Sequence, residues 1–118
     1  MNNLCEKSPI DIALDEELIG VNSKSDKRNL LEIIKPAYII LKPSLVGGFQ
    51  KSDCWISIAE ELNIGWWSTS ALESNVGLNA IAQWVINKTT SMHQGLGTGE
   101  LFTNNIDCPL SVKHGKLH

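Results

Sequence analysis

The ends of short apolar runs recur along this sequence at a nearly constant interval. Asp15, Lys42, Thr69 and Gly97 mark these ends, so the three steps along the chain are equal to within one residue. A strand, a crossover helix and two short loops need about this much chain when consecutive strands are parallel. The interval therefore predicts repeated β/α units and an α/β fold with a parallel sheet.

Each interval contains one candidate strand and one candidate helix. The apolar runs are PIDIAL (9–14), AYIIL (37–41) and IGWWS (64–68), and a weaker fourth strand is placed through the glycine-rich GLGTGELF (95–102). Short apolar runs bounded by turn residues are typical of buried parallel strands. Apolar residues with helical spacing follow the first three runs, in sets that include Leu30 to Ile34, Trp55 to Leu62 and Leu78 to Val85. The first helix should end at Pro36, and Ser74 or Asn75 could cap the third.

The carboxyl ends of these strands should lie at one edge of the sheet, because strands joined by right-handed crossovers run parallel to one another. In a β/α barrel or a doubly wound sheet this edge carries the functional site, since its loops vary while the strands hold position. The residues at the strand ends are therefore the candidates for chemistry.

Lys42 ends an apolar run and shares its face with Tyr38 and Ile40. A lysine at such a position either extends its ammonium group to water or is held in place for use. A held lysine suits proton abstraction or the stabilisation of a developing anion. Pattern alone leaves both interpretations open.

Asp15 follows the first run and would stand at the rim of the sheet. Its carboxylate could bind a metal ion there. The alternative is that Asp15 and Glu16 begin a solvated loop, and spacing does not separate the two interpretations.

Composition excludes several other classes of function. A formal net charge of −3 gives no basic surface for nucleic acid or an anionic membrane. The odd number of widely spaced cysteines predicts neither a disulfide framework nor a zinc site and fits a reducing cytoplasm. No run approaches the roughly 20 apolar residues that cross a bilayer.

Two short motifs also fail to match known functional patterns. GLGTGE has its third glycine at 99 rather than 100, so it is not a dinucleotide fingerprint. The STS of residues 68–70 lacks the G-x-S-x-G of a serine hydrolase.

Four motifs in order resemble the carboxyl-terminal part of the o-succinylbenzoate synthase family, within the enolase superfamily. They are ALDEELIG (13–20), ILKPSLVGG (40–48), STSALESNVGLNAIAQW (68–84) and HQGLGTGELFTNN (93–105). The resemblance implies the last four strands of an enolase-type (β/α) barrel over residues 1–110. The final segment SVKHGKLH (111–118) is predicted from its composition to be a polar tail. It also implies a Mg²⁺-assisted syn dehydration of 2-succinyl-6-hydroxy-2,4-cyclohexadiene-1-carboxylate in menaquinone biosynthesis.

The resemblance assigns roles to individual residues. Asp15 matches a metal-binding carboxylate, and Lys42 matches the lysine that stabilises the enediolate intermediate. The substrate-binding positions that it implies are Thr69, Ser70, Gly95 and Gly97. Glu73 matches a motif residue whose role is left open between local support and contact with the site.

The chain is short for this family. A full β/α barrel takes about 250 residues. The K-x-K lysine pair of the family and two further metal carboxylates are missing, so we expect a fragment that is inactive alone and needs the missing amino-terminal part or a second copy of itself. Two alternatives remain, an acylamino-acid racemase or dipeptide epimerase of the same superfamily and a non-enzymatic half-barrel that self-associates. GLGTGEL lacks the D-x-D expected of the epimerase.

Overall fold

The computed structural model describes residues 1–88, 90–97 and 102–118. Three parallel strands form one sheet in the order β1-β2-β3. Their bounds are Ala13–Leu14 for β1, Tyr38–Leu41 for β2 and Gly65–Ser68 for β3. The predicted α/β fold with parallel strands is confirmed, and the last residues of the three strands are equally spaced along the chain.

The first strand is shorter than predicted. Only Ala13 and Leu14 of the run 9–14 are paired, with Tyr38 and Ile39 of β2. Pro9 has no N–H group to donate, and β1 is the edge of this three-stranded sheet, so it has a partner on one side only. The second and third strands match their predicted runs to within one residue.

Helices connect the strands as the spacing predicts. These are α2 (Lys24–Ile34), α4 (Phe49–Glu61) and α5 (Asn75–Ile86). Ser23 caps α2, where its hydroxyl oxygen accepts a hydrogen bond from the N–H of Asp26 at 3.0 Å. Ser74 is the N-cap residue of α5. Three short helices were not predicted: α1 (Asn2–Lys7), the 3-10 helix η1 (Glu16–Leu18) and α3 (Pro43–Val46).

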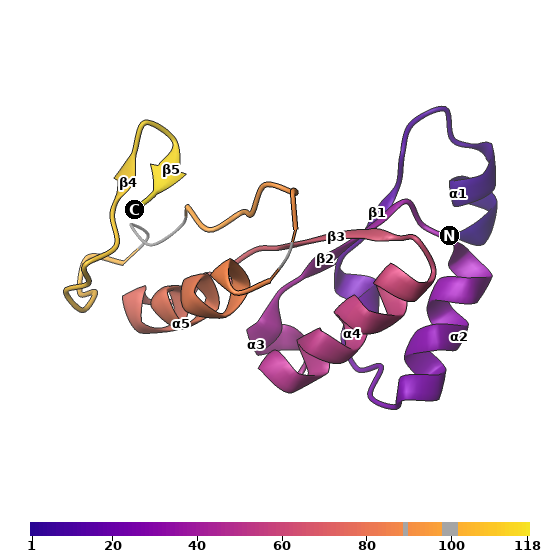
Figure 1. The fold of residues 1–118 in the computed structure, drawn as a ribbon, viewed down its shortest axis with the longest axis horizontal. Helices are drawn as coiled ribbons and strands as arrows, with labels where there is room; N and C mark the ends of the chain where they lie inside the picture. The colour runs from indigo at the N-terminus through magenta and orange to yellow at the C-terminus, as the bar shows by residue number, and fades with distance from the viewer. Residues whose placement is uncertain (89, 98–101) are drawn as a thin grey trace.

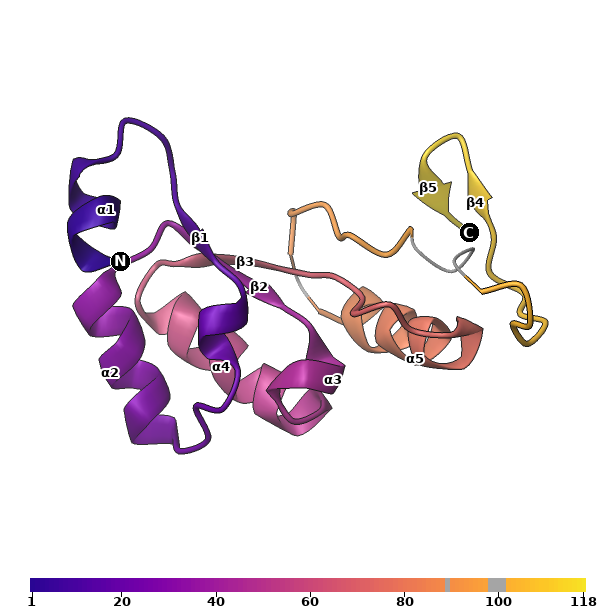
Figure 2. The ribbon, with the colours of Figure 1, turned by 180° about the vertical axis from the view of Figure 1, so that it is seen from behind.

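The core lies on one face of the sheet. Both ribbon views show α2 and α4 on the same side of the three strands (Figure 1 and Figure 2). The strand residues on that face are buried, namely Leu14, Ile39, Leu41, Trp66 and Ser68. Trp55 and Ile58 of α4 and Leu31 of α2 are buried with them. Alternation along the strands thus separates a packed face from an opposite face that these helices do not cover.

The carboxyl-terminal segment lies at the end of the molecule away from α2 (Figure 1), and Leu96 and Leu117 within it belong to or pack against the core. After α5 the chain returns to the sheet, where Gly95 forms a parallel bridge with Thr69. Part of the predicted fourth strand, residues 98–101, lies outside the described residues. The predicted polar tail contains an antiparallel hairpin of β4 (Val112–Lys113) and β5 (Lys116–Leu117). His114 and Gly115 both have positive φ angles, of 51° and 74°, as a two-residue hairpin turn requires.

Candidate functional site

The carboxyl ends of the three strands lie side by side. Leu41 pairs with Ser68 across β2 and β3, so Lys42 and Thr69 leave the sheet at the same level. Asp15 leaves β1 directly after Leu14. The register therefore gathers the predicted strand-end residues at one edge of the sheet.

Lys42 and Asp15 form an ion pair at this edge. The Nζ atom of Lys42 donates a hydrogen bond to Oδ2 of Asp15 at 2.8 Å. The Lys42 side chain is 19% exposed and the Asp15 side chain is 35% exposed. The ammonium group of Lys42 is therefore not simply extended into water. It is bound by a carboxylate that follows the neighbouring strand.

A tight turn fixes the backbone at Lys42. Lys42 is the N-cap residue of α3, and its carbonyl oxygen accepts hydrogen bonds from the N–H groups of Leu45 and Val46 at 2.8 and 3.2 Å. Pro43 occupies the first position of the helix, where its fixed φ angle is favourable. Gly47 and Gly48 have φ angles of 102° and 93°, a region that other residues rarely adopt, and they turn the chain from α3 into α4. The charge, the proline and the two glycines that follow the apolar strand are therefore parts of one turn.

Asp15 is held by the turn that follows it. It is the N-cap residue of η1, and its carbonyl oxygen accepts a hydrogen bond from the N–H of Leu18 at 3.2 Å. The N–H of Asp15 donates to Oε2 of Glu17 at 3.1 Å. Leu18 is fully buried and so anchors this turn to the core.

The structure brings three of the four predicted substrate-binding residues together. Gly95 donates its N–H to the carbonyl oxygen of Ser68 at 2.8 Å, and Ser70 donates its N–H to the carbonyl oxygen of Gly95 at 3.3 Å. The Oγ1 atom of Thr69 donates to the carbonyl oxygen of Ser70 at 2.9 Å. Gly97 lies two residues beyond the bridge and is exposed, and among the described residues other than its chain neighbours none has an atom within 4 Å of the position that a Cβ would take.

Glu73 links the two loops that follow β2 and β3. Its Oε1 atom accepts a hydrogen bond from Oγ of Ser44, and its Oε2 atom accepts one from the N–H of Ala71. Ser44 was not among the residues predicted for the site. No sequence motif separates it from an ordinary helix-start serine, so only the fold could reveal its contact.

The uncovered face of the sheet is apolar and aromatic. Tyr38, Ile40 and Trp67 on this face are each partly exposed. The rings of Tyr38 and Trp67 are 5.7 Å apart between centroids and inclined by 57°. A side chain at Gly65 would meet the Tyr38 ring at 2.4 Å, so the ring lies over this position of β3. Lys42 follows Ile40 on the same face by strand alternation.

The described residues do not complete a metal site. No three His, Cys, Asp or Glu side chains lie together within residues 1–88, 90–97 and 102–118. Mg²⁺ binds through several oxygen ligands in octahedral geometry. Asp15 would supply only one carboxylate ligand, and its Oδ2 atom already accepts a hydrogen bond from Lys42. The described residues therefore do not fit a Mg²⁺ ion by themselves.

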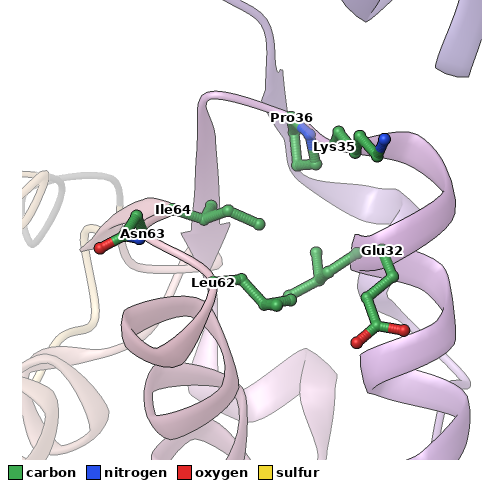
Figure 3. Close-up of a pocket in the computed structure, with 7 residues that line it drawn as sticks. Glu32, Lys35, Pro36, Leu62, Asn63 and Ile64 are labelled. Atoms are coloured by element: carbon green, nitrogen blue, oxygen red, sulfur yellow. The ribbon is translucent and has the colours of Figure 1, made fainter.

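A separate cavity of about 370 Å³ opens at the other edge of the sheet, where β2 and β3 begin (Figure 3). It is lined by Leu31, Glu32, Lys35, Pro36, Leu62, Asn63 and Ile64. These residues come from the carboxyl ends of α2 and α4 and from the segments that enter the strands. Sites of β/α proteins lie at the opposite edge, so this cavity is distinct from the site at Lys42.

Comparison with known proteins finds a longer relative. The chain is 55% identical over 117 residues to o-succinylbenzoate synthase of Desulfotalea psychrophila, a match that covers 99% of this chain and 32% of the relative. No protein-family model matches the chain. Its sequence resemblance to the carboxyl-terminal part of o-succinylbenzoate synthase is thus confirmed, and the chain spans about a third of the length of that relative.

Solved structures show the same relationship. The crystal structure of MenC from Desulfotalea psychrophila superposes with a TM-score of 0.93 at 54% identity, covering 98% of this chain and 32% of that one. Muconate cycloisomerase from Pseudomonas fluorescens superposes with a TM-score of 0.84 at 26% identity, covering 99% of this chain and 32% of its own.

Within the described ranges, no helix is long and apolar enough to span a bilayer.

Proposed function

We propose that this chain, whose sequence and fold are similar to those of part of o-succinylbenzoate synthase, is the carboxyl-terminal portion of such a lyase. In this proposal β1, β2, β3 and the strand that begins at Gly95 are the last four strands of an enolase-type barrel. One observation supports the proposal above the others. Lys42 and Asp15 are the predicted catalytic and metal-binding residues. Nζ of Lys42 lies 2.8 Å from Oδ2 of Asp15 at the carboxyl edge of the sheet.

The reaction that we propose is the syn dehydration of 2-succinyl-6-hydroxy-2,4-cyclohexadiene-1-carboxylate to o-succinylbenzoate. A general base takes the proton from the carbon beside the carboxylate, and hydroxide then leaves the neighbouring ring carbon and is protonated to water as the ring becomes aromatic. Removing that proton builds negative charge on the carboxylate oxygens. A cation held at a fixed position lowers the energy of this charge, because it needs no reorganisation during the reaction.

Lys42 is the residue of this chain that we assign to that role. Its ammonium group is fixed by Asp15 and by the turn at α3, and it lies on the face that a barrel would enclose. Enclosure would remove water and so strengthen its attraction for the developing anion. Thr69, Ser70, Gly95 and Gly97 are proposed to contact the substrate. The first three lie together, because Ser70 donates its N–H to Gly95, the Thr69 hydroxyl donates to the carbonyl oxygen of Ser70, and Thr69 and Gly95 form a parallel bridge.

The general base and most metal ligands must come from outside this chain. We propose that Asp15 supplies one oxygen ligand to Mg²⁺ once the remaining carboxylates are present. A divalent cation in that position would stabilise charge on the substrate carboxylate.

The partner that we propose is the missing amino-terminal part of the barrel, or a second copy of this chain. Tyr38, Ile40 and Trp67 leave an apolar face without cover from α2 and α4, and β1 leaves an unpaired edge in the described sheet. Such surfaces are normally paired or covered.

A cytoplasmic setting fits the three free cysteines, Cys5, Cys54 and Cys108, all of which lie in the described ranges. The racemase alternative is not favoured by the relative with 55% identity.

A chimera tests this proposal. The matching third of the Desulfotalea psychrophila enzyme is replaced by this chain, and dehydration of the cyclohexadiene substrate is followed with Mg²⁺ present. We expect turnover by the chimera, loss of turnover with Lys42→Ala, and no turnover by this chain alone. A folded chimera without activity would refute the proposal. A Lys113→Ala chimera, altered in the exposed hairpin, is the matched control and should remain active.

A further inference from the structure

We propose that Glu73 is a positioning residue that holds Lys42 in place through Ser44. The carboxylate of Glu73 bridges two segments that are distant in sequence, because one oxygen accepts from the Ser44 hydroxyl and the other from the Ala71 N–H. Ser44 follows Lys42 by two residues in α3, and Ala71 follows Thr69 by two residues after β3. The bridge therefore fixes the turn at Lys42 relative to the loop that begins with Thr69.

The conformation of the second loop supports this role. Leu72 has a φ angle of 59°, in the left-handed region, which costs a residue other than glycine on the order of 1 kcal/mol. Its side chain is 66% exposed, so packing of that side chain contributes little to offset this cost. The hydrogen bond from the Ala71 N–H to the Glu73 carboxylate spans Leu72 and holds it in this conformation.

Gly77 supplies a second and independent constraint on Glu73. A Cβ at Gly77 would lie 2.7 Å from Cγ and 3.1 Å from Cβ of Glu73. Gly77 is in the first turn of α5 and is not among the residues with positive φ, so its backbone would accept other residues. The space that it leaves is occupied by the Glu73 side chain. Glu73 is thus packed against α5 at its stem and hydrogen-bonded to both loops at its tip.

The geometry favours positioning over direct chemistry. Each oxygen of Glu73 already accepts a hydrogen bond from the protein, and charge-assisted bonds of this kind are stronger than neutral ones. A glutamine could replace only one of the two acceptors, because its amide nitrogen donates. The two changes Glu73→Ala and Glu73→Gln should therefore produce graded effects on Lys42.

Chemical labelling of this chain measures that effect without requiring activity. The rate of acetylation of Lys42 by acetic anhydride is followed by mass spectrometry, with Lys113 as the internal reference. Glu73→Ala should raise the Lys42 rate about fivefold, the change in population that loss of one hydrogen bond of typical strength produces. Glu73→Gln should give a smaller increase, and Ser44→Ala should resemble Glu73→Ala. Glu6→Gln, a change in exposed α1, is the matched control and should leave the rate unchanged.

An unchanged Lys42 rate in folded Ser44→Ala and Glu73→Gln variants would overturn the inference, even if Glu73→Ala failed to fold. The importance of this positioning for turnover rests on the proposed function and is tested in the chimera. There Glu73→Ala should lower kcat by about tenfold with a smaller change in KM, and Glu73→Gln should restore part of the loss. An inactive parent chimera would refute the proposed function, while the labelling result would still decide the role of Glu73. Equal losses for glutamine and alanine in both experiments would contradict the graded effect.

Discussion

Lys42 and Asp15, which are distant in sequence, are joined by an ion pair of 2.8 Å between Nζ and Oδ2. The pair connects the carboxyl end of β2 to that of β1, and both side chains remain partly exposed. Ion pairs in such surroundings contribute little to stability, because the charges remain hydrated and two side chains lose freedom. We therefore interpret the pair as an arrangement for chemistry rather than as a brace for the fold.

A double-mutant cycle tests that interpretation. Asp15→Asn, Lys42→Met and the double variant should show a coupling free energy below about 1 kcal/mol in urea unfolding of the chain. The same single changes should abolish turnover in the chimera. A coupling of several kcal/mol would instead make the pair structural.

The buried Lys27 should make the free energy of unfolding of the chain depend on pH, in a direction that follows from the shift in its pKa. Its side chain is buried, its Nζ donates to the carbonyl oxygen of Asn22 at 2.9 Å, and it lies 5.4 Å from the centroid of the Trp55 ring. Burial lowers the pKa of Lys27 from its usual value of 10.5. Between the folded pKa and 10.5 the unfolded chain binds more protons, so the contribution of Lys27 to folding becomes more favourable as pH rises through that window.

The comparison of wild type with Lys27→Met measures this contribution. The free energy of unfolding of wild type minus that of Lys27→Met should increase as pH rises toward about 10.5, the unfolded value of lysine. It should become flat at pH values below the folded pKa. A difference that falls with rising pH would contradict the sign.

Gly77→Ala should destabilise the chain although it places alanine in a helix. In an open helix position the same change stabilises by about 0.5–1 kcal/mol. Here the added methyl group would meet the Glu73 side chain at 2.7 Å. Thermal unfolding should therefore show a lower midpoint for Gly77→Ala, and the loss should disappear in the Glu73→Ala background. Equal effects of Gly77→Ala in both backgrounds would rule out this contact as the cause.

The uncovered face of the sheet should cause the isolated chain to associate. Tyr38, Ile40 and Trp67 are apolar, adjacent and partly exposed. Sedimentation velocity should show dimers or larger species that increase with concentration, and Trp67→Lys should shift the distribution toward monomer. Ile33→Lys, which alters an exposed apolar residue of α2, is the control for general solubility. A wild-type chain that stays monomeric at all concentrations would contradict the prediction.

The sequence by itself determined the repeating strand and helix units and the position of Lys42 at a strand end. The constant interval between strand ends and the helical spacing of apolar residues can be recognised in the sequence without knowledge of the tertiary contacts. The short helices η1 and α3 and the truncation of β1 were not predicted, because they depend on turn geometry and on which strand lacks a second neighbour.

Only the tertiary structure decided which side chains meet. The hydrogen bond between Ser44 and Glu73 and the ion pair between Lys42 and Asp15 each join residues from successive β/α units. Each contact depends on strand register and on the direction of the crossover, neither of which leaves a mark in the local pattern. The sequence could therefore place Asp15 and Lys42 at one edge and left the role of Glu73 open, whereas the pairing of Asp15 with Lys42 and of Glu73 with Ser44 arose from the packing of those units.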